Sequence, residues 1–275
     1  MSVMKNILVV SVNWLGDVVF STPVYRALKA AYPGARICVL AVPRVREVLE
    51  LCPDVDDVII YDEGGREKGL GGKIRAALAL RGRKFDAAFI LRCSLSRSLV
   101  LWLAGIPVRA GFGRMPWQWL LTHRADEKGA DEAHRSDVYL RVIQSFGVKG
   151  SERSARLEVP RDVCERLAMK LRARGLTGDE RITVLNTGGN WGLKQWPPDR
   201  FALLAARLTR ELGATVVLPG GPSDLSRVRR IAQDSGVDPV VLAGDTDLKE
   251  LAALFKRAHV VISADSGPLH LANAV

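Results

Sequence analysis

The 275-residue sequence predicts an α/β fold of two Rossmann-like, doubly wound domains that face a cleft. Short runs of β-branched residues alternate with longer helical patterns, which is typical of βαβ units around a parallel sheet. A polar, charge-rich stretch at residues 149–158 interrupts this alternation, which restarts at Arg181. The chain is also long enough for two domains of ordinary size.

The first domain is expected to cover residues 1–160. Its strands are predicted at residues 6–12, 36–41, 57–61, 87–91 and 108–111. Its helices are predicted at residues 18–31, 43–51, 73–80, 94–104 and 134–146. Strands and helices that alternate in this way form one doubly wound unit.

The second domain is expected to cover residues 179–275, after a linker or hinge helix at residues 161–178. Its strands are predicted at residues 182–186, 215–219, 240–243 and 260–263. Its helices are predicted at residues 199–212, 223–234 and 247–257. A doubly wound unit of this kind has about six strands. We therefore expect the second domain to be truncated at its C-terminus.

Composition excludes several classes of protein. A chain that is 48% hydrophobic and 25% charged is globular rather than disordered or fibrous. The apolar run at residues 98–108 is about half of the roughly 20 residues that a membrane-spanning helix requires. The four cysteines are scattered and show no CxxC spacing, so we expect neither zinc nor a disulfide framework, and a cytoplasmic location.

The formal net charge of +10 is unevenly distributed. Residues 1–160 hold 24 Lys and Arg against 17 Asp and Glu, whereas residues 161–275 hold 16 against 13. This excess suits an anionic membrane surface or a nucleic acid, and a solvated basic face with no partner is the alternative. No helix-turn-helix, zinc-finger or RNA-binding aromatic signature accompanies it, so we expect no nucleic-acid partner.

The most informative stretch is residues 262–274, where an apolar strand leads into a helix. Asp265, Ser266, Gly267 and His270 lie at this junction. A helix N-terminus offers free backbone N–H groups and a positive dipole end, which together suit a diphosphate. The alternative is an ordinary helix start, with Asp265 or Ser266 as the N-cap.

Asp17 follows the first predicted strand, in the segment Asn13-Trp14-Leu15-Gly16-Asp17. The carboxyl ends of parallel strands face the ligand crevice, so this carboxylate is placed for a general base. A helix N-cap is the alternative. The single glycine is not a GxGxxG fingerprint, and no acidic residue ends the second strand, so a nicotinamide cofactor is disfavoured.

Two loops of the second domain suggest the other half of a nucleotide site. The glycine-rich loop at residues 186–197 carries Thr187 and Lys194, a hydroxyl and a cation that suit phosphate oxygens. Asp224 follows the next strand and could accept hydrogen bonds from ribose hydroxyls. A flexible connection and a plain N-capped turn are the respective alternatives.

Four segments in order resemble the ADP-heptose:lipopolysaccharide heptosyltransferases of glycosyltransferase family 9, most closely their heptosyltransferase II branch. They are residues 13–17, 103–112, 194–197 and 265–271. The resemblance implies the GT-B arrangement of the two domains. It also implies inverting transfer of heptose from ADP-L-glycero-D-manno-heptose to the inner core of lipopolysaccharide, with no required metal or other cofactor.

The resemblance also implies roles for individual residues. Asp17 would be the general base, Asp265 would contact the donor sugar and Asp224 the ribose. The residues that would hold the diphosphate are Thr187, Lys194, Ser266, Gly267 and His270. The residues on the acceptor side would be Asn13, Trp14 and Gly16. One departure is Gly188, which stands where the family often has a second hydroxyl.

The implied partners are a nucleotide-sugar donor and an anionic, lipid-linked saccharide acceptor. A monomer in peripheral contact with the cytoplasmic membrane surface would suit such an acceptor, and the basic first domain is consistent with it. Three alternatives stay open. They are a family 9 transferase with another glycan or protein acceptor, a non-catalytic nucleotide-sugar-binding protein, and a basic nucleic-acid-binding protein.

Overall fold

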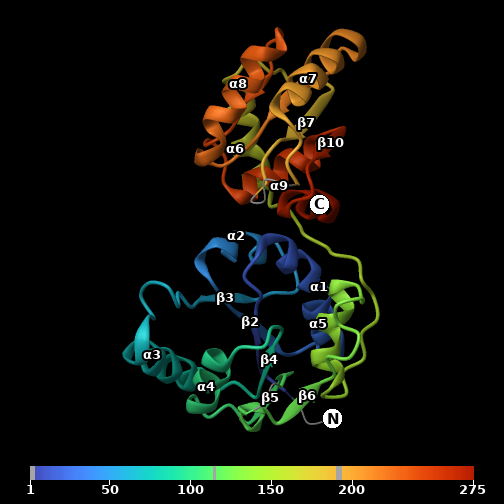
Figure 1. Cartoon of the computed structure of the whole chain (residues 1–275). Coiled ribbons are helices and arrows are strands. Elements are labelled where there is room, and N and C mark those ends of the chain that lie inside the picture. Colours follow the sequence, from blue (N-terminus) through green and yellow to red (C-terminus); the bar gives the residue numbers. More distant parts are fainter. Residues whose placement is uncertain (1–3, 114–115, 190–193) are drawn as a thin grey trace. The chain divides into compact units, whose positions relative to one another are not determined.

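The computed structural model describes residues 4–113, 116–189 and 194–275, and it divides into two compact units (Figure 1). The N-terminal unit comprises Met1–Leu157 and the C-terminal unit Glu158–Val275. The helix expected as a linker is α6 (Arg161–Arg172), and it packs against α9 (Leu248–Arg257). This helix is therefore part of the C-terminal unit.

The N-terminal unit contains a six-stranded parallel sheet in the order β3-β2-β1-β4-β5-β6. Its strands are β1 (Asn6–Val10), β2 (Arg36–Ala41), β3 (Asp57–Ile60), β4 (Ala87–Ile90), β5 (Val108–Phe112) and β6 (His123–Ala125). The first five match the expected strands. The sixth is a short edge strand that the sequence analysis missed.

Helices cover both faces of this sheet (Figure 1). They are α1 (Leu15–Ala31), η1 (Pro43–Val45), α2 (Arg46–Leu49), α3 (Gly69–Gly82), α4 (Leu95–Leu103), η2 (Gln118–Leu120) and α5 (Arg135–Gln144). Helix α1 packs on α5, and α3 packs on α4. Leu8, Val10 and Leu40 of the sheet form a buried core with Leu80 of α3 and Leu101 of α4. Burial on both faces explains why the strands read as continuous apolar runs.

The C-terminal unit contains a four-stranded parallel sheet in the order β10-β7-β8-β9. Its strands are β7 (Ile182–Asn186), β8 (Thr215–Leu218), β9 (Val240–Val241) and β10 (Val260–Ser263). Its further helices are α7 (Pro198–Leu212), η4 (Pro222–Asp224), α8 (Leu225–Ser235) and α10 (Gly267–Ala274). Helices α7 and α8 pack together over a core that includes Phe201, Leu218 and Ile231.

The strand order reverses next to β1 in the N-terminal unit and next to β7 in the C-terminal unit. In doubly wound sheets the ligand crevice opens at this point, beyond the carboxyl ends of the two central strands. The segments after β1 and β4, and those after β7 and β10, therefore border the crevice of their respective units. The expected fold class of Rossmann-like α/β units is confirmed.

No helix in the described part of the chain is both long and apolar enough to cross a membrane.

The segment between β1 and α1 is anchored by Arg97, which is 4% exposed. Its guanidinium donates to the Ser11 carbonyl oxygen and to Asn13 Oδ1, each at 2.8 Å, and pairs with Glu63 at 3.0 Å. On the other side of the segment, Arg44 Nε donates to the Asn13 carbonyl oxygen at 2.8 Å. These bonds fix the backbone that leads to Asp17.

Replacing Arg97 by Met is expected to destabilise the N-terminal unit by about 3 kcal/mol, because the buried carbonyl of Ser11 and the Glu63 carboxylate lose a charged donor. Urea unfolding followed by circular dichroism measures the change. The exposed Arg81 on α3 provides the control, since Arg81→Met should have little effect. Equal stability of the two variants would contradict this account of the anchor.

Candidate functional site

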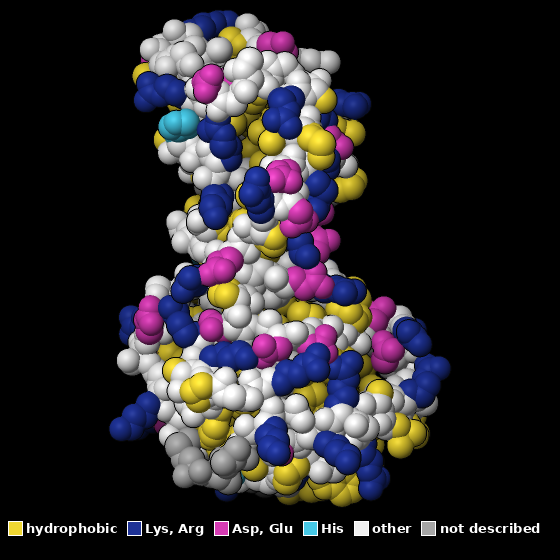
Figure 2. Space-filling model, turned by 180° about the vertical axis from the view of Figure 1, so that it is seen from behind, with side chains coloured by type: hydrophobic (Ala, Val, Ile, Leu, Met, Phe, Trp, Pro, Cys, Tyr) yellow, Lys and Arg dark blue, Asp and Glu magenta, His cyan; other side chains and the backbone are white. Residues whose placement is uncertain are grey.

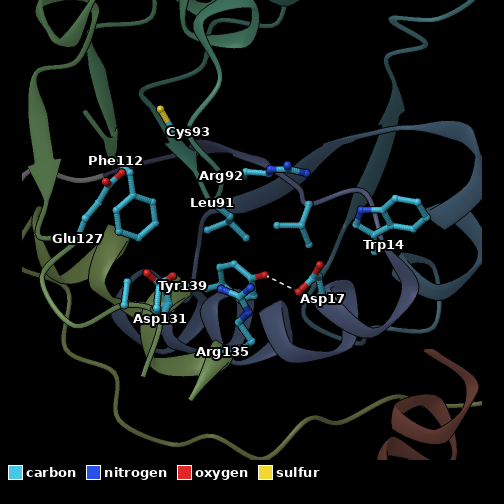
Figure 3. Close-up of a pocket in the computed structure, with 13 residues that line it drawn as sticks. Trp14, Asp17, Leu91, Arg92, Cys93, Phe112, Glu127, Asp131, Arg135 and Tyr139 are labelled. Atoms are coloured by element: carbon cyan, nitrogen blue, oxygen red, sulfur yellow. Dashed lines mark hydrogen bonds between the residues drawn. The ribbon is translucent and has the colours of Figure 1, made fainter. Parts of the chain in front are cut away.

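A pocket of about 510 Å³ lies at the carboxyl ends of β1 and β4, with α5 as one wall (Figure 3). Asp17 lies in it, as expected from its position after the first strand. The residues that line the pocket are Val12, Trp14, Asp17, Leu91, Arg92, Cys93, Phe112, Glu127, Ala130, Asp131, Arg135, Val138 and Tyr139. The pocket belongs wholly to the N-terminal unit.

Asp17 is held by a single hydrogen bond from the described residues. The Tyr139 hydroxyl donates to Asp17 Oδ1 at 2.9 Å, as the dashed line in Figure 3 shows. Burial and the adjacent carboxylate raise the pKa of Tyr139 above its ordinary value, so this side chain stays a hydrogen-bond donor. The bond fixes one oxygen of Asp17 and leaves the other for a ligand.

The pocket carries charges of both signs. Arg92, just after β4, and Arg135, in the first turn of α5, line it together with Asp17 (Figure 3). Glu127 and Asp131 lie on the side away from Trp14. The two guanidinium groups could bind an anionic ligand beside the Asp17 carboxylate.

The sequence did not predict a role for Arg92, Arg135 or Tyr139. Arg92 could have been found, because it lies two residues after β4, the strand next to β1 at the reversal of strand order. Arg135 and Tyr139 lie on α5, far along the chain from Asp17, and no local pattern marks them.

The three acceptor-side residues are placed differently from one another. Trp14 lines the pocket and stacks under the Arg44 guanidinium, 4.2 Å from the ring centroid. Asn13 uses its side-chain oxygen to hold Arg97, so it positions the segment instead of lining the pocket. Gly16 lies in the first turn of α1, next to Asp17, and does not line the pocket.

In the C-terminal unit, Lys194 forms an ion pair with Asp265, which follows β10. The hydrogen bond and the charge of Lys194 lower the pKa of the Asp265 carboxyl, and the charge of His270 acts in the same direction. Three of the expected donor-site residues therefore interact with one another.

Ser266 is the N-cap residue of α10, but its side chain makes no capping hydrogen bond. Its hydroxyl instead accepts from Asn186 Nδ2 at 3.3 Å and donates to the Ala264 carbonyl oxygen at 3.2 Å. Ser266 therefore holds the N-cap position, as the alternative interpretation expected, but its side chain does not cap the helix. Gly267 begins the helix, and the next residue, Pro268, has no N–H group.

Thr187 follows β7 and is buried. Its hydroxyl has no hydrogen-bond partner among the described residues. Buried polar atoms are nearly always paired in folded proteins, so an unpartnered hydroxyl at the carboxyl end of a central strand suits a ligand site. The phosphate contact expected of Thr187 stays a prediction.

Asp224 is engaged by its own turn. Its carboxylate accepts from the Gly221 backbone N–H at 3.0 Å and from Arg227 at 2.6 Å. A Cβ atom built on Gly188 would lie 3.4 Å from Asp224 Oδ2 and 3.5 Å from the Arg227 guanidinium. The glycine loop thus runs close to the pair of Asp224 and Arg227. Arg227 is a second cation near this loop, and it was not predicted from the sequence.

The structure places the residues after β7 and those after β10 at one edge of the sheet. Asp224 lies beside the glycine-rich loop that follows β7. Part of the loop, residues 190–193, lies outside the described residues. Among the described residues, no three His, Cys, Asp or Glu side chains are placed to hold a metal ion. The arrangement offers hydroxyls, cations and a helix N-terminus, which are groups that bind phosphates.

Comparison with known proteins identifies the family of the chain. The family model for glycosyltransferase family 9 (heptosyltransferase) matches residues 74–275. Lipopolysaccharide heptosyltransferase 2 of Salmonella typhimurium is 29% identical over 283 residues, covering 98% of this chain and 80% of that protein.

Solved structures show the same likeness. A glycosyl transferase family 9 structure from Veillonella parvula is 28% identical with a TM-score of 0.89, and covers 99% of this chain and 78% of that one. E. coli ADP-heptose lps heptosyltransferase II is 26% identical with a TM-score of 0.80, and the match covers 98% of this chain and 81% of that one.

Two Rossmann-like units with these neighbours define a glycosyltransferase of the GT-B class. The chain belongs to glycosyltransferase family 9, the heptosyltransferase family.

The hydrogen bond between Tyr139 and Asp17 has a measurable consequence at alkaline pH. Because the pKa of Tyr139 is raised in the folded chain, the unfolded chain loses this proton first, at about pH 10. The free energy of unfolding therefore falls as the pH rises above that value. In Tyr139→Phe the fall should be shallower by up to about 1.4 kcal/mol per pH unit.

Urea unfolding between neutral pH and pH 12 measures these slopes. In Asp17→Asn the slope should lie between those of the wild type and Tyr139→Phe, because the neighbouring negative charge is gone but the burial remains. Identical slopes in all three proteins would contradict the coupling of Tyr139 to Asp17.

Proposed function

We propose that the chain transfers a heptose from ADP-L-glycero-D-manno-heptose to the inner core of lipopolysaccharide, with inversion at the anomeric carbon. The observation that carries this proposal is Asp17, held by Tyr139 in a pocket that also contains Arg92 and Arg135. The E. coli relative, named as an ADP-heptose lps heptosyltransferase, supports the choice of donor and acceptor.

Asp17 is the general base of the proposed reaction. Its Oδ2 takes the proton of an acceptor hydroxyl while the hydroxyl oxygen forms a bond to the anomeric carbon of the heptose. The bond from that carbon to the diphosphate breaks on the opposite face, and the electron pair leaves with ADP. Tyr139 keeps the carboxylate oriented through Oδ1, so the base is in place before the acceptor binds.

The residues after β7 and β10 stabilise the leaving diphosphate. The Thr187 hydroxyl, the Lys194 ammonium group and the N-terminus of α10 at Ser266 and Gly267 supply hydrogen-bond donors and positive charge. Negative charge grows on ADP as the bond breaks, so donors aimed at it lower the barrier. His270, one turn into α10, adds a further donor.

Donor binding breaks the ion pair between Lys194 and Asp265. The ammonium group moves to the diphosphate, and the Asp265 carboxylate turns to the hydroxyl groups of the heptose. We retain Asp224 as a ribose contact, although its bonds to Gly221 and Arg227 leave it less free than the sequence suggested.

Arg92 and Arg135 bind the anionic groups of the acceptor, and Trp14 packs against its sugar rings. The enzyme acts as a monomer on the cytoplasmic side, in peripheral contact with the membrane that holds the lipid-linked acceptor. The proposed chemistry needs no metal ion or other cofactor, so transfer is expected to proceed equally well in EDTA.

Asp17→Asn tests the base. It is expected to lower the rate of heptose transfer at least about 10³-fold, because the amide cannot accept the proton. The affinity for ADP should change by less than about twofold, since the donor site lies in the C-terminal unit. Transfer is measured by mass spectrometry of the acceptor, and affinity by calorimetry. Asp131→Asn, in the same pocket, is the matched control.

Substantial transfer by Asp17→Asn would overturn the assignment of the base. A wild-type chain that binds ADP and transfers no sugar to any glycan or protein acceptor would instead be a nucleotide-sugar-binding protein.

Lys194→Met tests the diphosphate site. Loss of one charge-assisted contact is expected to weaken ADP binding about tenfold to hundredfold, while adenosine, which carries no phosphate, should bind the variant and the wild type alike. The exposed Lys256 on α9 provides the control, and Lys256→Met should bind ADP like the wild type. Unchanged ADP affinity in Lys194→Met would exclude Lys194 from the diphosphate site.

A further inference from the structure

Helix α3 is apolar on its outer face as well as on its inner face. Ala77 and Leu80 belong to the core, but Leu70, Ile74 and Leu78 project outward and are 69%, 45% and 61% exposed. Their spacing of four residues aligns them along one side of the helix. A surface helix normally presents polar residues to water, so this outer stripe indicates a partner.

Two tryptophans are exposed on the elements next to α3. Helix α4 packs beside α3, and η2 packs beside α4. Trp102 of α4 and Trp119 of η2 are 45% and 63% exposed, and their rings meet edge to face at 5.8 Å. Leu95 and Leu103 of α4 are exposed as well. We call the outward residues of α3, α4 and η2 the outer apolar face.

The chain segment that forms this face is strongly basic. Residues 68–125 contain eleven Lys and Arg but one acidic residue, Asp86. Of these cations, Arg97 is buried and Arg92 lines the pocket, whereas Lys73, Arg75 and Arg81 lie on α3. The Asp86 carboxylate is engaged by the backbone N–H groups of Lys5 and Asn6. By contrast, residues 47–67 contain eight acidic residues and one arginine. Figure 2 shows hydrophobic side chains together with Lys and Arg, and with some Asp and Glu, on one face of the N-terminal unit.

We propose that the outer apolar face docks on the surface of an anionic lipid bilayer. Leucine, isoleucine and tryptophan side chains enter the boundary between headgroups and acyl chains, where tryptophan is favoured. The flanking cations, among them Lys73, Arg75 and Arg81 on α3, attract anionic headgroups. The inference rests on the proposed function for a membrane-bound acceptor, and it adds which surface makes the contact.

Other occupants fit the face less well. Two copies of the chain docked through it would bring the cations of α3 on one copy against those on the other, and like-charge repulsion opposes this contact. A nucleic acid would use the cations and leave the outward leucines and isoleucine in water. An anionic bilayer would bury the apolar stripe and pair its headgroups with the flanking cations.

The test is binding of the full chain to vesicles of phosphatidylglycerol and phosphatidylcholine in equal parts, measured by co-sedimentation without nucleotide or acceptor. The triple variant Leu70→Ser, Ile74→Ser and Leu78→Ser should lower the partition coefficient at least about tenfold. Its matched control alters three exposed apolar residues of the C-terminal unit, Met169→Ser, Leu203→Ser and Leu212→Ser, and should bind like the wild type.

Charge is tested separately. The variant Lys73→Gln, Arg75→Gln and Arg81→Gln should weaken binding about fivefold for each charge removed. High salt, or vesicles of phosphatidylcholine alone, should weaken wild-type binding as well. The blue shift of tryptophan fluorescence on vesicle addition should disappear in Trp102→Ala with Trp119→Ala.

Several results would overturn the proposal. They are no vesicle binding by the wild type, equal losses in the α3 triple variant and its control, dimerisation through the outer apolar face, or binding to duplex DNA in place of vesicles. Circular dichroism and ADP titration of each variant show whether it is folded with an intact donor site. Loss of vesicle binding with ADP binding unchanged therefore separates this inference from the proposed transfer.

Discussion

Parallel pairing of the central strands is the constraint on which both units depend. β1 lies between β2 and β4, and β7 lies between β8 and β10. Because the strands within each sheet run in the same direction, their carboxyl ends lie at one edge of that sheet, and the connections on either side of its reversal point diverge there. The loops at this edge are thus brought together by backbone hydrogen bonding before any side chain of the site is considered.

Polar contacts then give each loop its particular shape. In the N-terminal unit, buried Arg97 fixes the segment before Asp17, and Tyr139 orients the carboxylate from a helix on a distant part of the chain. In the C-terminal unit, Asn186 ties the end of β7 to Ser263 and Ser266 after β10. The same sheet geometry therefore positions a carboxylate in one unit and the proposed phosphate-binding groups in the other.

The alternation of apolar runs and helical patterns was enough to predict the fold class and nearly every strand. β6 was missed because His123-Arg124-Ala125 has no β-branched residue, and its pairing with β5 depends on tertiary contact. Asp17, in the first turn of the helix after β1, and Asp265, two residues after β10, were predictable because each lies where a strand passes into the next helix. Tyr139 and Arg135 were not, since helix packing brings them to the pocket. Asp224 was predicted to contact a ligand, and the structure shows that its carboxylate already accepts hydrogen bonds from Gly221 and Arg227.

The central claim is that the carboxyl edge of the C-terminal sheet is a metal-independent site for ADP. Calorimetric titration of the full chain with ADP in EDTA, alongside titrations with NAD and a short DNA duplex, tests it most directly. The account predicts saturable binding of ADP at one site, with much weaker binding of NAD and DNA. A folded chain that fails to bind ADP, or that binds NAD or DNA more tightly, would contradict it.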